Sequence, residues 1–327
     1  MLLKKIIIIF TALLFVGISA QKISYTVPEL FKNEISEKNY KTIADLSIKE
    51  ISKREKVFSL DDGVIKTESG FQAGLDNLLY KSKNQNDDKV LAAIVKEHFD
   101  GLFDSMDFSK SMDLKDFNKV KEHLSLRIYP EEYFDQYFKP ENVVFKKDLE
   151  GTITILMLDL PTAFTNVMRK EMFDFWKKDE KDLFALAQQN INKQTVTKLT
   201  QEIDLGGSKI EISFIENETY AGSYALDLIN NSTDFVGDLG SVVAFPNKGL
   251  INICKITTEK PVDFVKFIQG MKSLVEKFHD NHPYPISTDF FWYYNNKFTK
   301  IMVIEKPNGN IDVVSPDELT KLLVKLK

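Results

Sequence analysis

The apolar positions of the chain follow two periods, one typical of helices and one typical of strands. From Glu37 to Arg54 they recur at helical spacing, and they do so again from Pro261 to about His279. Between such stretches the pattern shortens to that of strands, as in "KVFSL", "KIEISFI" and "GLINICKI". Hairpin signals outnumber crossover units, so we predict an α+β fold with mixed, largely antiparallel sheets and packed helices.

Short polar stretches between these segments predict turns and helix starts. Asp61-Asp62-Gly63 separates two β-like runs and predicts a hairpin, because glycine accepts a positive φ. Pro246-Asn247-Lys248 predicts a turn between two further strands. We expect Asn86 or Asp87 to open one helix and Asp179 to open another, since a short polar side chain caps the first free amides.

The middle of the chain contains its strongest strand signal. "GTITILMLDL", from Gly151 to Leu160, is a long β-branched run that suits a central strand buried on both faces. The segment from Thr165 to Trp176 is predicted to be helical, with its large apolar residues on one side.

The first twenty residues have the features of a secretory signal peptide. Lys4-Lys5 gives a basic start, Ile6 to Val16 is almost entirely apolar, and Ile18-Ser19-Ala20 offers small residues for cleavage. We expect cleavage after Ala20, and an uncleaved N-terminal anchor is the alternative. The mature chain contains no further apolar run long enough to span a membrane. The sequence therefore predicts export to a periplasm or an extracellular space.

The predicted organisation has three parts. Residues 1–20 are the signal peptide, residues 21–54 a lead-in and a helix, and residues 55–327 an α+β domain that two packed halves would compose. No linker rich in proline, glycine or serine separates such halves. A boundary between them would fall near Asp113 or Lys193.

Composition and charge narrow the class of partner. The chain is 43% hydrophobic and 28% charged, which is typical of globular proteins. Loss of two lysines with the signal peptide takes the formal net charge from −5 to about −7. Nucleic acids and anionic membrane surfaces reward clustered positive charge, so we exclude them as partners.

Neither cysteine chemistry nor a histidine metal site is predicted. Cys254 is the single cysteine, which excludes an intramolecular disulfide and a cysteine-based zinc site, and its apolar surroundings predict a buried, inert thiol. His279 and His282 are spaced for one helical turn, but Pro283 ends the helix there. A role at the helix end is favoured, and we predict no metal and no cofactor.

The segment "NETYAGSYALDL" allows a catalytic and a structural interpretation of Ser223. A strand precedes it and a helix is expected to follow, as at a nucleophile elbow, but the flanking glycines of such an elbow are incomplete. In the catalytic interpretation His282 is the base and Asn190 orients it. In the structural one, which we favour, Ser223 or Thr219 caps the following helix.

The aromatic run "DFFWYYNNKF" also has two interpretations. Its adjacent rings, Trp292 among them, would stack on a carbohydrate if the strand exposed one face. A strand covered on both sides is the favoured alternative.

Five local patterns keep their order between Lys56 and Ile304. They are "VFSLDDGVIKTE"; Ala187 and Asn190 in "LFALAQQNI"; Tyr220, Gly222, Ser223 and Leu226 in "TYAGSYALDL"; Val243, Ala244 and Pro246 in "GSVVAFPNKGLINI"; and His282, Pro285 and Ile286 in "HPYPIST". In these patterns the chain resembles the YtpQ-like family of uncharacterised bacterial proteins. The resemblance implies an α+β domain and supplies no activity, and the signal peptide and added N-terminal helix depart from that family.

These observations favour a non-catalytic secreted or periplasmic binding or interaction protein. Its partner would be a protein or a glycan of the cell envelope, and its ligand-binding residues would include Asn190, Tyr220 and Trp292. The alternative is a cell-envelope serine hydrolase that uses Ser223 and His282.

Overall fold

The chain forms two compact units, one ending at Lys96 and the other beginning at Glu97. The structure is a computed structural model that describes residues 22–205, 207–307 and 310–326, so the predicted signal peptide lies outside it. Residues 55–96, which the sequence grouped with the later part, belong to the first unit. Helix α3 (Asp88–Ser111) begins in the first unit and ends in the second.

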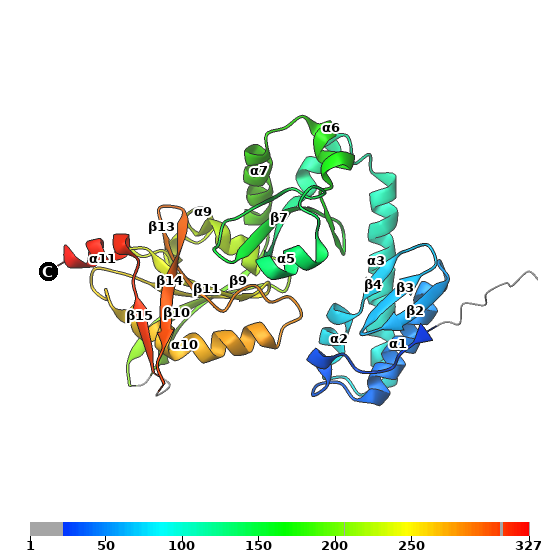
Figure 1. Cartoon of the computed structure of the whole chain (residues 1–327), viewed down its shortest axis with the longest axis horizontal. Coiled ribbons are helices and arrows are strands. Elements are labelled where there is room, and N and C mark those ends of the chain that lie inside the picture. The colour runs from blue at the N-terminus through cyan, green and yellow to red at the C-terminus, as the bar shows by residue number, and fades with distance from the viewer. Residues whose placement is uncertain (1–21, 206, 308–309, 327) are drawn as a thin grey trace, which may run out of the picture. The chain divides into compact units, whose positions relative to one another are not determined.

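The first unit contains a four-stranded sheet, helices α1 and α2 and the start of α3 (Figure 1). The sheet has the order β1-β2-β3-β4, with β1 parallel to β2 and the other pairs antiparallel. Asp62 and Gly63 both have positive φ, 43° and 72°, which confirms the predicted hairpin. The elements are β1 (Lys22–Ile23), α1 (Glu37–Ile51), β2 (Val57–Asp61), β3 (Val64–Thr67), β4 (Gln72–Gly74) and α2 (Asp76–Ser82).

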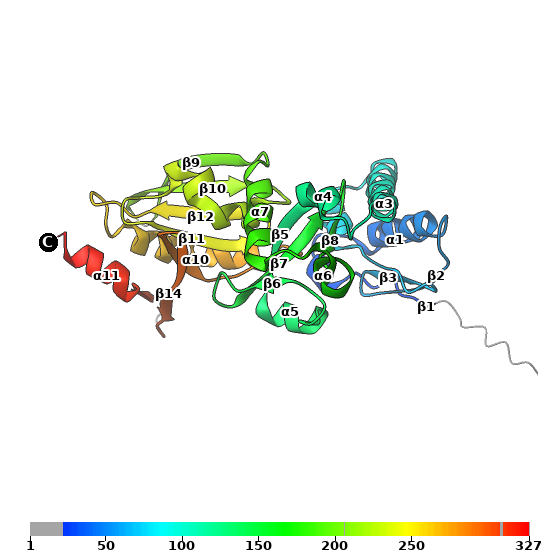
Figure 2. The same cartoon turned by 90° about the horizontal axis from the view of Figure 1, so that it is seen from above.

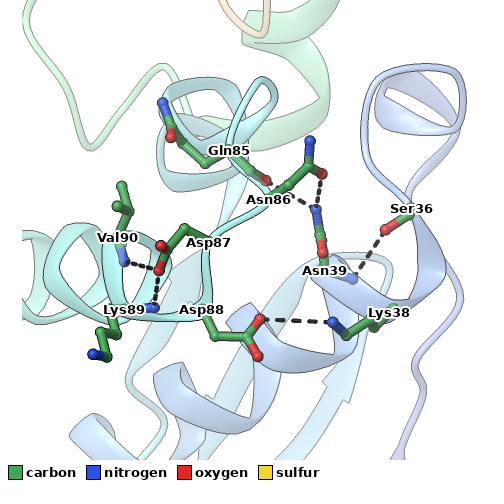
Figure 3. A network of polar contacts seen from close by, with 9 residues as sticks. All are labelled: Ser36, Lys38, Asn39, Gln85, Asn86, Asp87, Asp88, Lys89 and Val90. Atoms are coloured by element: carbon green, nitrogen blue, oxygen red, sulfur yellow. Dashed lines mark hydrogen bonds and ion pairs between the residues drawn. The ribbon is translucent and has the colours of Figure 1, made fainter.

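Polar side chains fix the start of α3 beside α1 (Figure 3). The Asp87 carboxylate accepts from the Lys89 and Val90 amides at 2.7 and 3.3 Å, so Asp87 is the predicted cap. The amide of Asn39 on α1 donates to the Gln85 carbonyl at 2.9 Å. Hydrogen bonds therefore hold the segment between α2 and α3 at both Gln85 and Asp87.

The second unit contains a four-stranded and a seven-stranded sheet. The small sheet has the order β5-β7-β6, with β8 also paired to β7, and the large one has the order β15-β14-β13-β11-β12-β10-β9. The elements up to the large sheet are α4 (Phe117–Val120), β5 (Leu124–Pro130), α5 (Glu131–Tyr137), β6 (Phe145–Lys146), β7 (Thr152–Asp159), β8 (Phe164–Asn166), α6 (Asp174–Trp176) and α7 (Glu180–Asn192). Those that follow are β9 (Thr197–Asp204), β10 (Lys209–Glu216), α8 (Ala221–Tyr224), α9 (Leu228–Asn231), β11 (Ser241–Asn247), β12 (Leu250–Lys255), α10 (Asp263–Asp280), β13 (Phe290–Tyr294), β14 (Lys297–Glu305), β15 (Ile311–Val314) and α11 (Asp317–Val324).

Helices cover the faces of these sheets. Helix α7 lies beside β5 and β7 (Figure 2), and its apolar side chains join a core that includes residues of both sheets. Helix α10 packs on the large sheet through Phe267, Ile268 and Met271. Every strand pair of this unit that the structure describes is antiparallel, so the α+β prediction is confirmed. None of the described helices is long and apolar enough to cross a membrane.

Two local predictions need correction. Between Thr165 and Trp176, residues up to Asn166 pair with β7 as β8, and only the turns from Arg169 onward are helical. The turn between β11 and β12 lies at Lys248-Gly249, because Pro246 and Asn247 still belong to β11. In both cases pairing with a neighbouring strand decides the conformation.

Candidate functional site

One face of the small sheet carries a group of charged and aromatic residues. Arg127 lies in β5, opposite Ile155 of β7, and Asp159 is the last residue of β7. Phe164 of β8 pairs directly with Asp159 and therefore lies on the same face. Tyr220, just before α8, reaches this group with its hydroxyl. We call Arg127, Asp159, Phe164 and Tyr220 the arginine cluster.

A turn around Asn217 positions Tyr220. The Asn217 side-chain oxygen accepts from the Thr219 and Tyr220 amides at 2.8 and 2.9 Å, and therefore caps this segment. The predicted cap by Ser223 or Thr219 is wrong, because Ser223 lies within α8. Asparagine four residues upstream of α8 serves instead, since its side chain reaches two amides at once.

Gly222 allows the same segment to approach its neighbours closely. The Gly222 amide donates to the Lys248 carbonyl at 2.9 Å. A β-carbon added at Gly222 would lie 2.9 Å from the Ile286 side chain, which is too close without a shift. Glycine at this position thus keeps the Tyr220 segment against the β11–β12 turn.

The Tyr220 hydroxyl donates to Asp159 Oδ2 at 2.5 Å. Burial raises the pKa of Asp159, although the bond from Tyr220 and the positive charges of Arg127 and His123 oppose the rise. Burial and the bond to Asp159 both raise the pKa of Tyr220, so its hydroxyl keeps its proton at neutral pH. The pair is therefore a fixed donor and acceptor, with Asp159 Oδ1 still open to a further donor.

Arg127 is half-buried beside this pair. Its guanidinium carbon lies 4.1 Å from the centre of the Phe164 ring. Burial lowers the pKa of Arg127 and the nearby Tyr129, Tyr284 and Asp159 oppose this, but arginine stays protonated in proteins. Among the residues that the structure describes, none forms an ion pair or a hydrogen bond with this guanidinium.

Tyr284 and its neighbours border the cluster. Lys248 Nζ lies 4.0 Å from the centre of the Tyr284 ring, and the Lys248 amide donates to the Tyr284 carbonyl. His282 Nδ1 accepts from the Tyr284 amide at 3.0 Å, with the two ring centres 6.4 Å apart. His282 is thus near the cluster through Tyr284.

The other residues singled out from the sequence have structural surroundings. Ser223 is buried and its hydroxyl donates to the Tyr220 carbonyl at 3.3 Å, and no hydrogen bond joins it to His282. Asn190 is buried and donates to the Lys121 and Leu124 carbonyls, which fastens α7 to the start of β5. Trp292 is 1% exposed and donates to the Leu239 carbonyl at 2.9 Å, so its ring offers no stacking surface.

Sequence reasoning missed Arg127 and Asp159. The sequence did contain a signal for both residues, because each is a charged residue within an otherwise apolar strand. The chain also contains only three arginines among its 43 basic residues, so an arginine within "LSLRIYP" is unusual for this sequence. Neither signal identifies the residues that Arg127 and Asp159 contact in the folded chain.

No group of three metal-ligating side chains occurs among the residues described. Cys254 is buried in the large sheet, and burial raises the pKa of its thiol to about 12, so the thiol stays protonated. The chain matches no protein-family model, no curated protein and no solved structure. The site must therefore be interpreted from its own chemistry: an arginine without a protein acceptor, a fixed carboxylate and aromatic rings.

Proposed function

We propose that the protein is an exported, non-catalytic binding protein whose ligand presents a carboxylate or phosphate group to Arg127. The observation that carries the proposal is the half-buried guanidinium without a hydrogen bond or ion pair to any described residue. The guanidinium nitrogens are not fully buried, so they are accessible to a ligand, and an arginine fork matches the two oxygens of a carboxylate or phosphate. A ligand oxyanion would therefore meet a partly desolvated fork for which no described residue competes as an acceptor.

The surroundings of Arg127 support a binding role in two further ways. The Phe164 ring lies against the guanidinium, which restricts its orientation before any ligand arrives. None of the described residues donates to Asp159 Oδ1, so it can accept from a hydroxyl or ammonium group on the same ligand. A small molecule with an anionic group next to such a donor fits both residues.

The geometry gives a catalytic role little support. A serine nucleophile needs a base within hydrogen-bond reach, and the Ser223 hydroxyl instead faces a backbone carbonyl. The Tyr220–Asp159 pair has a proton held firmly by tyrosine, which suits orientation better than proton transfer. Export is part of the same proposal and is supported by the N-terminal pattern, and kinship with the YtpQ-like proteins is proposed from the five ordered sequence patterns alone.

The test is thermal unfolding of residues 21–327 with a panel of small carboxylates, inorganic phosphate and sugar phosphates. We expect at least one ligand to raise the midpoint, and Arg127→Met to abolish the rise. Arg169→Met is the matched control, because Arg169 is not part of the cluster and instead forms an ion pair with Glu180 at 2.8 Å. No shift with any member of the panel, or an equal shift in the Arg127 variant, would contradict the proposal.

A further inference from the structure

A groove of about 890 Å³ lies on the second unit and includes no member of the arginine cluster. It is lined by one side of α7, the segment after β6, residues at and before α9, and the β13–β14 turn. Its volume falls within the range of pockets that bind small molecules. Phe184, Leu226 and Phe298 supply its apolar part.

In the groove, the side-chain nitrogens of Gln188 and Asn230 donate to protein groups, and their oxygens remain open as acceptors. Gln188 Nε2 donates to the Asn192 side chain and the Ser223 carbonyl, which leaves its oxygen as an acceptor. Asn230 Nδ2 donates to Asp227 at 2.8 Å, and its own oxygen is also open.

Asn296 has the opposite polarity. Its oxygen accepts from the Tyr293 hydroxyl at 2.8 Å, which leaves the nitrogen as a donor. The groove thus offers oriented acceptors and a donor next to apolar side chains.

The charges of the lining are unevenly satisfied. Its three carboxylates have at least one protein partner each: Asp148 pairs with Lys146 through Oδ1 while its buried Oδ2 has no hydrogen bond, Glu180 pairs with Arg169, and Asp227 accepts from Asn192 and Asn230. Lys181 and Lys297 are exposed and form no ion pair with a described residue. The groove therefore has a surplus of positive charge on a protein that is negative overall.

We propose that this groove binds an acidic oligosaccharide. Sugar hydroxyls donate to the open Gln188 and Asn230 oxygens, the apolar faces of sugar rings pack on the half-buried Leu226 and Phe298, and carboxylates face the two lysines. An acidic peptide fits less well. Its ionised side chains are acceptors only, so the single backbone amide of each residue would have to satisfy the open oxygens, whereas each sugar residue carries several hydroxyl donors.

The experiment is calorimetric titration of residues 21–327 with an oligogalacturonate, a neutral malto-oligosaccharide and an oligoglutamate of equal length. We expect the oligogalacturonate to bind most tightly. The double variant Lys181→Gln/Lys297→Gln and the single variant Asn230→Ala should each weaken binding about tenfold or more, with unchanged circular dichroism. The control Lys119→Gln/Lys170→Gln removes two exposed lysines outside the groove and should bind like the parent.

Each other outcome overturns the proposal. Absence of oligogalacturonate binding does so, as does equal or tighter binding of the oligoglutamate or of the neutral sugar. Unchanged affinity in the Lys181→Gln/Lys297→Gln or Asn230→Ala variants also does so. Arg127→Met should leave this affinity unchanged, so failure here is distinguishable from failure of the anion site at Arg127.

Discussion

The two faces of the small sheet have opposite characters although the same strands form them. On one face Leu126 and Leu156, which lie opposite each other, are buried with α7 in the largest core. On the other, α5 covers an apolar part around Ile153 and Ile155, and the rest carries the arginine cluster. Strand alternation permits this, because neighbouring residues point to opposite sides.

This difference separates stability from binding. The Leu126–Leu156 face is formed mainly by buried apolar side chains, whereas the arginine cluster places an arginine and an aspartate where burial disfavours both charges. Charged groups held against the effect of burial are typical of binding and catalytic sites. Substitutions on the apolar face should therefore cause the larger losses of stability, and only those at the arginine cluster should alter ligand binding.

The largest expected loss of stability comes from the apolar face. Leu156→Ala removes a fully buried side chain and should lower the free energy of unfolding by about 2–5 kcal/mol. Denaturant unfolding measures this. A loss below about 1 kcal/mol would show that this face does not hold the unit together.

Removing the Tyr220 hydroxyl should have an intermediate effect. Tyr220→Phe deprives Asp159 of its donor and should cost about 1–3 kcal/mol by the same measurement. Tyr129→Phe is the matched control, because the Tyr129 hydroxyl has no hydrogen bond among the described residues. Equal losses in the two variants would deny the Tyr220–Asp159 bond any special role.

Asp159→Asn should change the free energy of unfolding by less than Tyr220→Phe does, and the size of its effect should depend on pH. The folded-state pKa of Asp159 is raised, so its contribution is most favourable below the unfolded-state pKa and is lost as pH rises through the folded value. The variant should thus gain stability relative to the parent on going from about pH 3 to neutral pH. A difference that is flat across this window would contradict the burial of Asp159.

The smallest effect is expected at Ser223. Ser223→Ala loses one hydrogen bond to a backbone carbonyl and should cost about 0.5–1.5 kcal/mol, with ligand binding at Arg127 intact. A fluorophosphonate probe should leave Ser223 of the folded parent unlabelled. Stoichiometric labelling would restore the hydrolase alternative.

Local patterns predicted much of the fold. The Asp62-Gly63 turn, the Asp87 cap and the buried strand β7 follow from φ preferences, capping and β-branched runs, which act over a few residues. Where distant pairing decides, the pattern was insufficient. Residues 164–166 form β8 because β7 is available beside them, and no helical period reveals that.

The site was less predictable for the same reason. Tyr220 was singled out, but its partner Asp159 lies 61 residues earlier and meets it only through the packing of α8 near the end of β7. The alternation of β5 places the Arg127 side chain on the other face of the sheet from Leu126 and Ile128. The sequence does not, however, identify the Phe164 ring that lies beside it. Ser223 and Trp292 looked chemically promising and are buried by neighbours that the sequence does not identify.

The most direct test of the central claim uses the scarcity of arginine in this chain. With three arginines, the Nε–H region of a nitrogen–proton correlation spectrum contains three signals at most, and Arg127→Met identifies the one from Arg127. During titration with the ligand found in the thermal screen, we predict a saturable shift of the Arg127 signal while those of Arg54 and Arg169 stay in place. Saturation of binding without a shift of the Arg127 signal would contradict the account.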